Sequence, residues 1–120
     1  MAKRIFVIED DLHIRESLKE ILEIEGYDVI SAVNGQDALD QLRSGQIADL
    51  ILLDLMMPIK DGYQFKIEQD QDPELAKIPV IVMSANSNFA DKKELKSARE
   101  HLKKPIELET LLNSIDKLIQ

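Results

Sequence analysis

The sequence contains no cysteine and no tryptophan, and only 4% of its 120 residues are aromatic. Without cysteine the chain has no disulfide bonds or thiolate metal sites, and a reducing compartment is favoured, so we expect a cytoplasmic protein. A core with so few aromatic rings must be largely aliphatic. No apolar run approaches the roughly 20 residues that span a bilayer, and the start of the chain does not resemble a signal peptide. We therefore expect no membrane association.

Acidic residues outnumber basic ones by 23 to 15, which gives a net charge of −8. This balance argues against direct nucleic-acid binding, which requires a basic face. The basic residues are unevenly placed, because six of them lie between Lys92 and Lys104. A solvated helix face is the favoured interpretation of this stretch, and a surface for docking a partner is the alternative.

Five apolar or branched stretches predict strands. Three do not alternate with polar residues, which is typical of strands buried on both faces, and the other two are weaker. In chain order the five are Ile5–Ile8, Tyr27–Ile30, Leu50–Leu53, Ile78–Met83 and His101–Leu102.

Helical spacing of apolar residues separates these strands. The first helix carries a stripe from Ile14 to Leu22 and ends at Gly26, and Asn34 and Gly45 bound the second. The others are expected from Asp61-Gly62 to before Asp72-Pro73, around Asp91 to Ala98, and over residues 108–118. Alternating strands and helices predict an α/β fold, with a doubly wound parallel sheet covered by helices on both faces. No linker or repeat interrupts the chain, so residues 1–120 are expected to form one domain.

Polar residues follow several of the predicted strands. They are Glu9, Asp10 and Asp11 after the first strand, Asp54 after the third, Ser84 after the fourth and Lys104 after the fifth. In a parallel sheet these positions share one edge, where ligands bind. Clustered carboxylates repel one another unless they hold a cation such as Mg²⁺, and an Asp beside that metal can accept a phosphoryl group.

Each of these residues also has an ordinary structural explanation. Asp54 could cap a loop, Ser84 could be a turn residue, and Lys104 is one of fifteen basic residues. For Asp11 the better explanation is a helix N-terminus that favours acidic residues. The indication of a phosphoacceptor site therefore depends on the whole set at one edge of the sheet.

Four motifs in this order resemble the receiver domains of two-component response regulators, the CheY-like family, over essentially the whole chain. They are Val7–Asp11, Leu53–Pro58 followed by Asp61-Gly62, Ile81–Ala85, and Lys104-Pro105. The resemblance implies a flavodoxin-like (βα)5 fold with strand order 2-1-3-4-5. It also implies that Asp54 is the phosphorylated residue.

The resemblance further implies a Mg²⁺ site, with Mn²⁺ as a substitute. Asp10, Asp54 and the backbone carbonyl of Met56 would bind the metal directly, and Glu9 would bind it through water. Lys104 would pair with the phosphoryl group, and its bond to Pro105 would be cis.

Other implied roles concern the response to phosphorylation. Ser84 would hydrogen-bond the phosphoryl group, and Ala85 would be small enough to leave room for it. His101 stands where the family usually has Tyr or Phe, and it is either a switch residue or a plain surface histidine. The chain also departs from the family pattern at Ile59, where glycine is common. Between Ser84 and Lys104 it is about two residues short.

The implied function is that of a phosphorelay receiver. Asp54 would take its phosphoryl group from a sensor histidine kinase or phosphotransfer protein and switch binding to an unknown output partner, with a homodimer as one option. The domain would catalyse only its own phosphorylation and slow dephosphorylation. One alternative is a pseudo-receiver that docks proteins without phosphorylation. A haloacid-dehalogenase-type phosphohydrolase is disfavoured, because Met56 stands where that family needs a second Asp.

Overall fold

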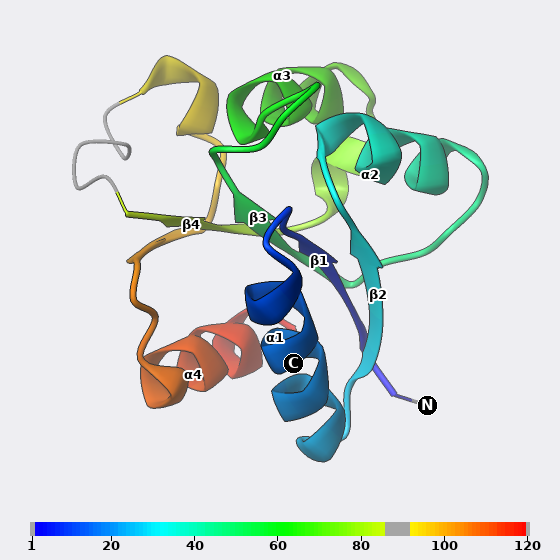
Figure 1. Ribbon diagram of the computed structural model, residues 1–120. Coiled ribbons are helices and arrows are strands. Elements are labelled where there is room, and N and C mark those ends of the chain that lie inside the picture. Colours follow the sequence, from blue (N-terminus) through cyan, green and yellow to red (C-terminus); the bar gives the residue numbers. More distant parts are fainter. Residues whose placement is uncertain (1, 86–91, 120) are drawn as a thin grey trace.

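The computed structural model describes residues 2–85 and 92–119. These residues fold around one five-stranded parallel sheet, which forms the centre of the domain (Figure 1). Its strand order is β2-β1-β3-β4-β5, so the expected order is confirmed. Central β1 and β3 pair with Phe6 opposite Ile51 and Ile8 opposite Leu53. The strands are β1 (Arg4–Ile8), β2 (Asp28–Ala32), β3 (Leu50–Asp54), β4 (Val80–Ser84) and β5 (Glu100–Lys103).

Helices cover both faces of the sheet, as expected for a doubly wound fold. In Figure 1, α1 and α4 lie on one side of the sheet and α2 and α3 lie on the other. The four are α1 (Leu12–Ile24), α2 (Gly35–Arg43), α3 (Gly62–Gln71) and α4 (Leu108–Leu118). None of the described helices is long and apolar enough to cross a membrane.

The helix predicted around Asp91 to Ala98 is wrong for the part that the structure describes. Residues 92–98 form only a 3-10 turn, η3 (Lys93–Leu95), and Asp91 lies outside the described residues. This stretch offers one buried apolar side chain, Leu95, so it has no stripe that a longer helix would bury. A second 3-10 turn, η1 (Leu75–Lys77), precedes β4. The strand predicted to begin at Ile78 starts two residues later in the structure, because β4 begins at Val80.

The core has two parts, one on each face of the sheet. The cluster under α2 and α3 contains Phe6 and Phe65, and the cluster under α1 and α4 contains only aliphatic buried side chains. All five residues of β3 and of β4 are buried, which explains why their sequences do not alternate. Full burial of each large apolar side chain contributes about 1.5–3 kcal/mol.

Side-chain caps fix where the first three helices begin. Asp11, Asn34 and Asp61 each accept a hydrogen bond from a backbone N–H three residues later, at 2.8–3.0 Å. Asp61 also forms a capping box, because the Gln64 side chain accepts a bond from the Asp61 backbone N–H. These caps place the loops that carry the polar residues at the carboxyl edge of the sheet.

Ile59 has a backbone conformation that suits glycine better. Its φ is +69°, and its side chain is 83% exposed in the loop between β3 and α3. The left-handed conformation costs about 1–2 kcal/mol for an ordinary L-residue and less for Asn.

We therefore expect Ile59→Asn to raise the free energy of unfolding by about 1 kcal/mol, measured by urea denaturation. Ile47→Asn is the control, because Ile47 is similarly exposed and has no positive φ. An equal gain in both variants would mean that removing an exposed apolar side chain, and not relief of the backbone, is responsible.

Candidate functional site

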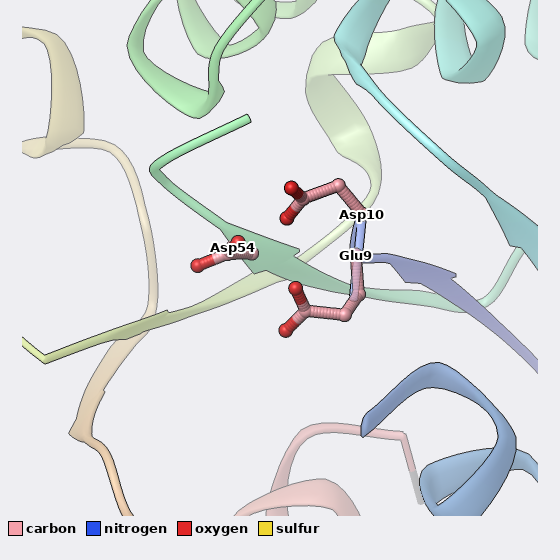
Figure 2. Close-up of side chains that lie close together, drawn as sticks. All are labelled: Glu9, Asp10 and Asp54. Carbon is pink, nitrogen blue, oxygen red and sulfur yellow. The ribbon is translucent and has the colours of Figure 1, made fainter. Parts of the chain in front are cut away.

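Three carboxylates meet at the carboxyl edge of the sheet. Glu9 and Asp10 directly follow β1, and Asp54 is the last residue of the neighbouring strand β3. One carboxylate oxygen of each residue lies within 4.8 Å of those of the other two. Figure 2 shows the three side chains projecting from these strand ends into the same space. Glu9 and Asp54 are buried, whereas Asp10 is exposed.

Lys104 joins this cluster from the end of β5. Its Nζ donates to Glu9 Oε1 at 2.8 Å and to Asp54 Oδ1 at 3.2 Å. Its backbone N–H donates to the Ser84 carbonyl at 2.8 Å, so the ends of β4 and β5 are held together. The peptide bond from Lys104 to Pro105 is cis, which confirms that prediction.

The charges in the site perturb one another. Burial raises the pKa of Glu9 to about 7, and the negative charge of Asp54 adds to the rise, although the bond from Lys104 opposes it. Burial alone would lower the pKa of Lys104, but its bond to Glu9 and the nearby Asp54 raise it instead. The three carboxylates thus carry more negative charge than the Lys104 ammonium neutralises.

The turn after β1 is fixed by α1. Asp11 caps the helix through the Ile14 N–H at 3.0 Å, which also lowers the pKa of Asp11. The prediction that Asp11 lies at a helix N-terminus is therefore confirmed. The Arg15 Nη1 donates to the carbonyls of Glu9 at 2.9 Å and Asp10 at 3.3 Å. Sequence reasoning missed Arg15. A cation near a helix N-terminus is unfavourable for the dipole, and that was the available signal of a local partner.

The remaining predicted site residues lie around the cluster. Ser84 is buried at the end of β4, and Ala85 next to it is exposed. Met56 lies two residues beyond Asp54, and 74% of its surface is exposed. His101 is half-buried, and its Nε2 lies 3.3 Å from the Leu95 carbonyl oxygen. His101 thus contacts η3, whereas Lys104 contacts the carboxylates.

The donor set fits a hard divalent cation. The clustered side chains of Glu9, Asp10 and Asp54 offer carboxylate oxygens, the kind of ligand that Mg²⁺ and Mn²⁺ prefer. The raised pKa of Glu9 means that its ionised form is disfavoured in the absence of additional positive charge. A cation would supply that charge where Lys104 alone does not.

A parallel sheet that brings acidic residues and a lysine together at its carboxyl edge is the architecture of receiver domains. The family model described as "Response regulator receiver domain" matches residues 5–116. The chain therefore belongs to this family, and the resemblance inferred from its motifs is confirmed.

Several relatives support this assignment. The chain is 32% identical to Protein PilH of Pseudomonas aeruginosa over 118 residues, which are 97% of each protein. It is 37% identical to Response regulator RR06 of Streptococcus pneumoniae over 97% of this chain and 52% of that one. The chain thus spans nearly all of one relative and about half of the other.

Solved structures agree with the sequence relatives. The response regulator TrrA of Thermotoga maritima, solved in complex with Mg²⁺-BeF, is 34% identical and has a TM-score of 0.87 over 97% of this chain and 98% of that one. The chemotaxis response regulator CheY4 of Vibrio cholerae is 25% identical, with a TM-score of 0.88 over 98% and 99%.

Proposed function

We propose that Asp54 accepts a phosphoryl group in a Mg²⁺-dependent reaction and that this changes which partner the domain binds. One observation carries the proposal: Glu9, Asp10 and Asp54 lie together while Lys104 bonds to two of them. Asp54 is buried at the end of an otherwise apolar strand, where an ionised carboxylate costs free energy unless it is paired.

Asp10, Asp54 and the Met56 backbone carbonyl would hold the metal, and Glu9 would contribute through a water molecule. The cation would supply positive charge that lets a phosphoryl group approach the carboxylates. Mn²⁺ would suit the same oxygen ligands. TrrA, a relative solved with Mg²⁺-BeF, supports this assignment.

Phosphoryl transfer requires little from the protein beyond positioning of the reactants and stabilisation of negative charge. An Asp54 carboxylate oxygen attacks the phosphorus of the donor, and an O–P bond forms as the P–N bond of a phosphohistidine breaks. The electron pair of that bond leaves with the imidazole nitrogen. Lys104, already 3.2 Å from Asp54 Oδ1, supplies positive charge to the phosphoryl oxygens.

Three residues would respond to the phosphoryl group: Ser84, Ala85 and His101. The Ser84 hydroxyl would donate to a phosphoryl oxygen, and Ala85 would leave the space for it. Because the Ser84 carbonyl accepts from the Lys104 N–H, movement at one strand end is transmitted to the next. Phosphorylation would then shift the population of two arrangements, with His101 responding from β5.

The donor would be a sensor histidine kinase or a phosphotransfer protein. An apolar groove of about 600 Å³ runs between α1 and the connection after β5, lined by Ile14, Leu18, Pro105 and Ile106, and reaches Lys104. We propose that the donor docks over this groove, which brings its phosphohistidine to Asp54. The domain would work in the cytoplasm, spanning residues 1–120, without binding nucleic acid itself.

The test is phosphorylation by a small acyl phosphate in the presence of Mg²⁺, followed by intact-mass measurement. We expect a gain of one phosphoryl group, with complete loss in Asp54→Asn and in a sample without metal. Asp40→Asn, an exposed carboxylate on α2, is the control and should still gain the group. No gain in the wild type, with the fold intact and Mg²⁺ not bound, would instead indicate a pseudo-receiver.

A further inference from the structure

The buried face of α3 carries two long polar side chains. Its buried residues are Gly62, Phe65, Lys66 and Gln69, at the i, i+3, i+4 and i+7 positions of one helix face. Lys66 is 2% exposed, and Gln69 is fully buried. Lysine is almost never fully buried unless its ammonium is paired, so the partners of Lys66 show what it holds.

Lys66 joins α3 to the turn that precedes β5. Its Nζ donates to Asp70 Oδ1 and to Ser97 Oγ, both at 2.7 Å. The Ser97 hydroxyl in turn donates to Asp70 Oδ2 at 2.7 Å. These three side chains, termed the Lys66 cluster, form a closed triangle in which every bond involves a charged group. Such bonds are about twice as strong as neutral ones.

Gln69, also on α3, makes similar side-chain hydrogen bonds to the segment that precedes β4. Its Nε2 donates to the carbonyls of Leu75 at 2.9 Å and Ile78 at 3.1 Å. Helix α3 therefore holds both irregular connections of β4: the one containing η1 before the strand and residues 92–99 after it. The hydrogen bonds of the Lys66 cluster hold the second of these connections, residues 92–99, to α3.

Apart from the Lys66 cluster, the described long-range contacts of residues 92–99 lie mainly at Leu95, Ala98 and Arg99. The Leu95 side chain is fully buried, and its carbonyl oxygen lies near His101. The Arg99 N–H donates to the Val80 carbonyl at 2.9 Å, whereas the backbone bonds of Leu95, Lys96 and Ala98 are local, each to a carbonyl three residues earlier. Segments with so few long-range contacts open more readily than the core does.

We propose that the Lys66 cluster is a conformational device that closes residues 92–99 onto α3 as a separately opening unit. The closed position fixes where the exposed side chains of Lys92, Lys93 and Lys96 stand on the surface. The proposal does not rest on phosphorylation of Asp54, because Lys66, Asp70 and Ser97 bond to one another and not to the carboxylate site. Its test therefore uses the unmodified protein without Mg²⁺.

The test is amide hydrogen exchange of Ser97→Ala and Lys66→Met against the wild type. We expect exchange in residues 92–99 to be about tenfold faster or more in both variants, while amides of β1 and β3 are unchanged. Ser97→Thr keeps the hydroxyl and should restore the wild-type rate. Lys77→Met breaks an exposed ion pair with Glu74 and should change nothing.

Two outcomes would overturn the proposal. Unchanged exchange in residues 92–99 would mean that the cluster holds nothing, and equal acceleration in β1 and β3 would mean that Lys66 only stabilises the whole fold. If Lys66→Met does not fold, Ser97→Ala decides, because Ser97 lies in an exposed turn. The double variant should exchange less than twofold faster than either single one, since all three bonds belong to one triangle.

Discussion

Glu9→Gln is expected to stabilise the metal-free protein at pH 8 and to leave it nearly unchanged at pH 4. Glu9 is 1% exposed, and burial next to Asp54 raises its pKa from 4.5 to about 7. A shift of this size corresponds to about 3 kcal/mol of penalty for the ionised form. Glutamine removes the charge, and its amide oxygen still accepts the bond from Lys104.

The pH window follows from the direction of the shift. Between about pH 4.5 and 7 the folded protein holds a proton on Glu9 that the unfolded chain has lost. The free energy of unfolding of the wild type therefore falls as pH rises through this window, and the Glu9→Gln curve lacks that fall. Urea denaturation in EDTA at several pH values measures both curves.

Mg²⁺ provides the complementary measurement. At pH 8, added metal should stabilise the wild type much more than Glu9→Gln. In the wild type the cation offsets the negative charge of the ionised Glu9 carboxylate, and Glu9→Gln has no such charge to offset. Glu16→Gln, which changes an exposed carboxylate on α1, is the matched control and should follow the wild type in both experiments. A parallel pH dependence of wild type and Glu9→Gln would show that Glu9 is not the group that titrates.

The sequence was most informative where side chains of one character repeat. The uninterrupted apolar residues of β3 predicted a buried strand, and Asp54 directly behind them predicted a functional carboxylate. Lys104 lies fifty residues further along, yet a parallel topology was enough to bring it to Asp54. Strand order and the roles of site residues came from the family resemblance, because periodicity does not determine which strands are neighbours.

It was least informative for α3 and residues 92–99. The apolar Ile67 is 42% exposed, whereas its charged neighbour Lys66 is buried, which is the reverse of what residue type suggests. Tertiary contacts contribute to this, since Lys66 bonds to Ser97, thirty-one residues away, as well as to Asp70 on its own helix. Lys92–Ala98 has good helix formers but a single buried anchor, Leu95, so propensity alone gave the wrong structure.

Gly62→Ala is expected to lower the free energy of unfolding by about 3 kcal/mol and to weaken the metal site as well. A Cβ at Gly62 would lie 2.5 Å from the Asp54 carbonyl oxygen and 2.8 Å from the Leu55 Cα. Both contacts are with backbone, so no side-chain rotation relieves them. The Gly62 N–H also donates to the Leu55 carbonyl at 2.9 Å, which ties α3 directly to the end of β3.

Gly45→Ala separates this close packing from the general effect of replacing glycine. Gly45 has a φ of +109° and no atom within 4 Å of an added Cβ, so only backbone strain of about 1–2 kcal/mol is expected. Urea denaturation compares the stabilities, and a Mg²⁺ titration of each variant compares the sites. Because the clash displaces the backbone that carries Asp54 and Met56, Gly62→Ala should bind the metal more weakly while Gly45→Ala binds it as the wild type does. Equal stability losses in the two variants, with equal Mg²⁺ affinity, would mean that α3 does not set the position of Asp54.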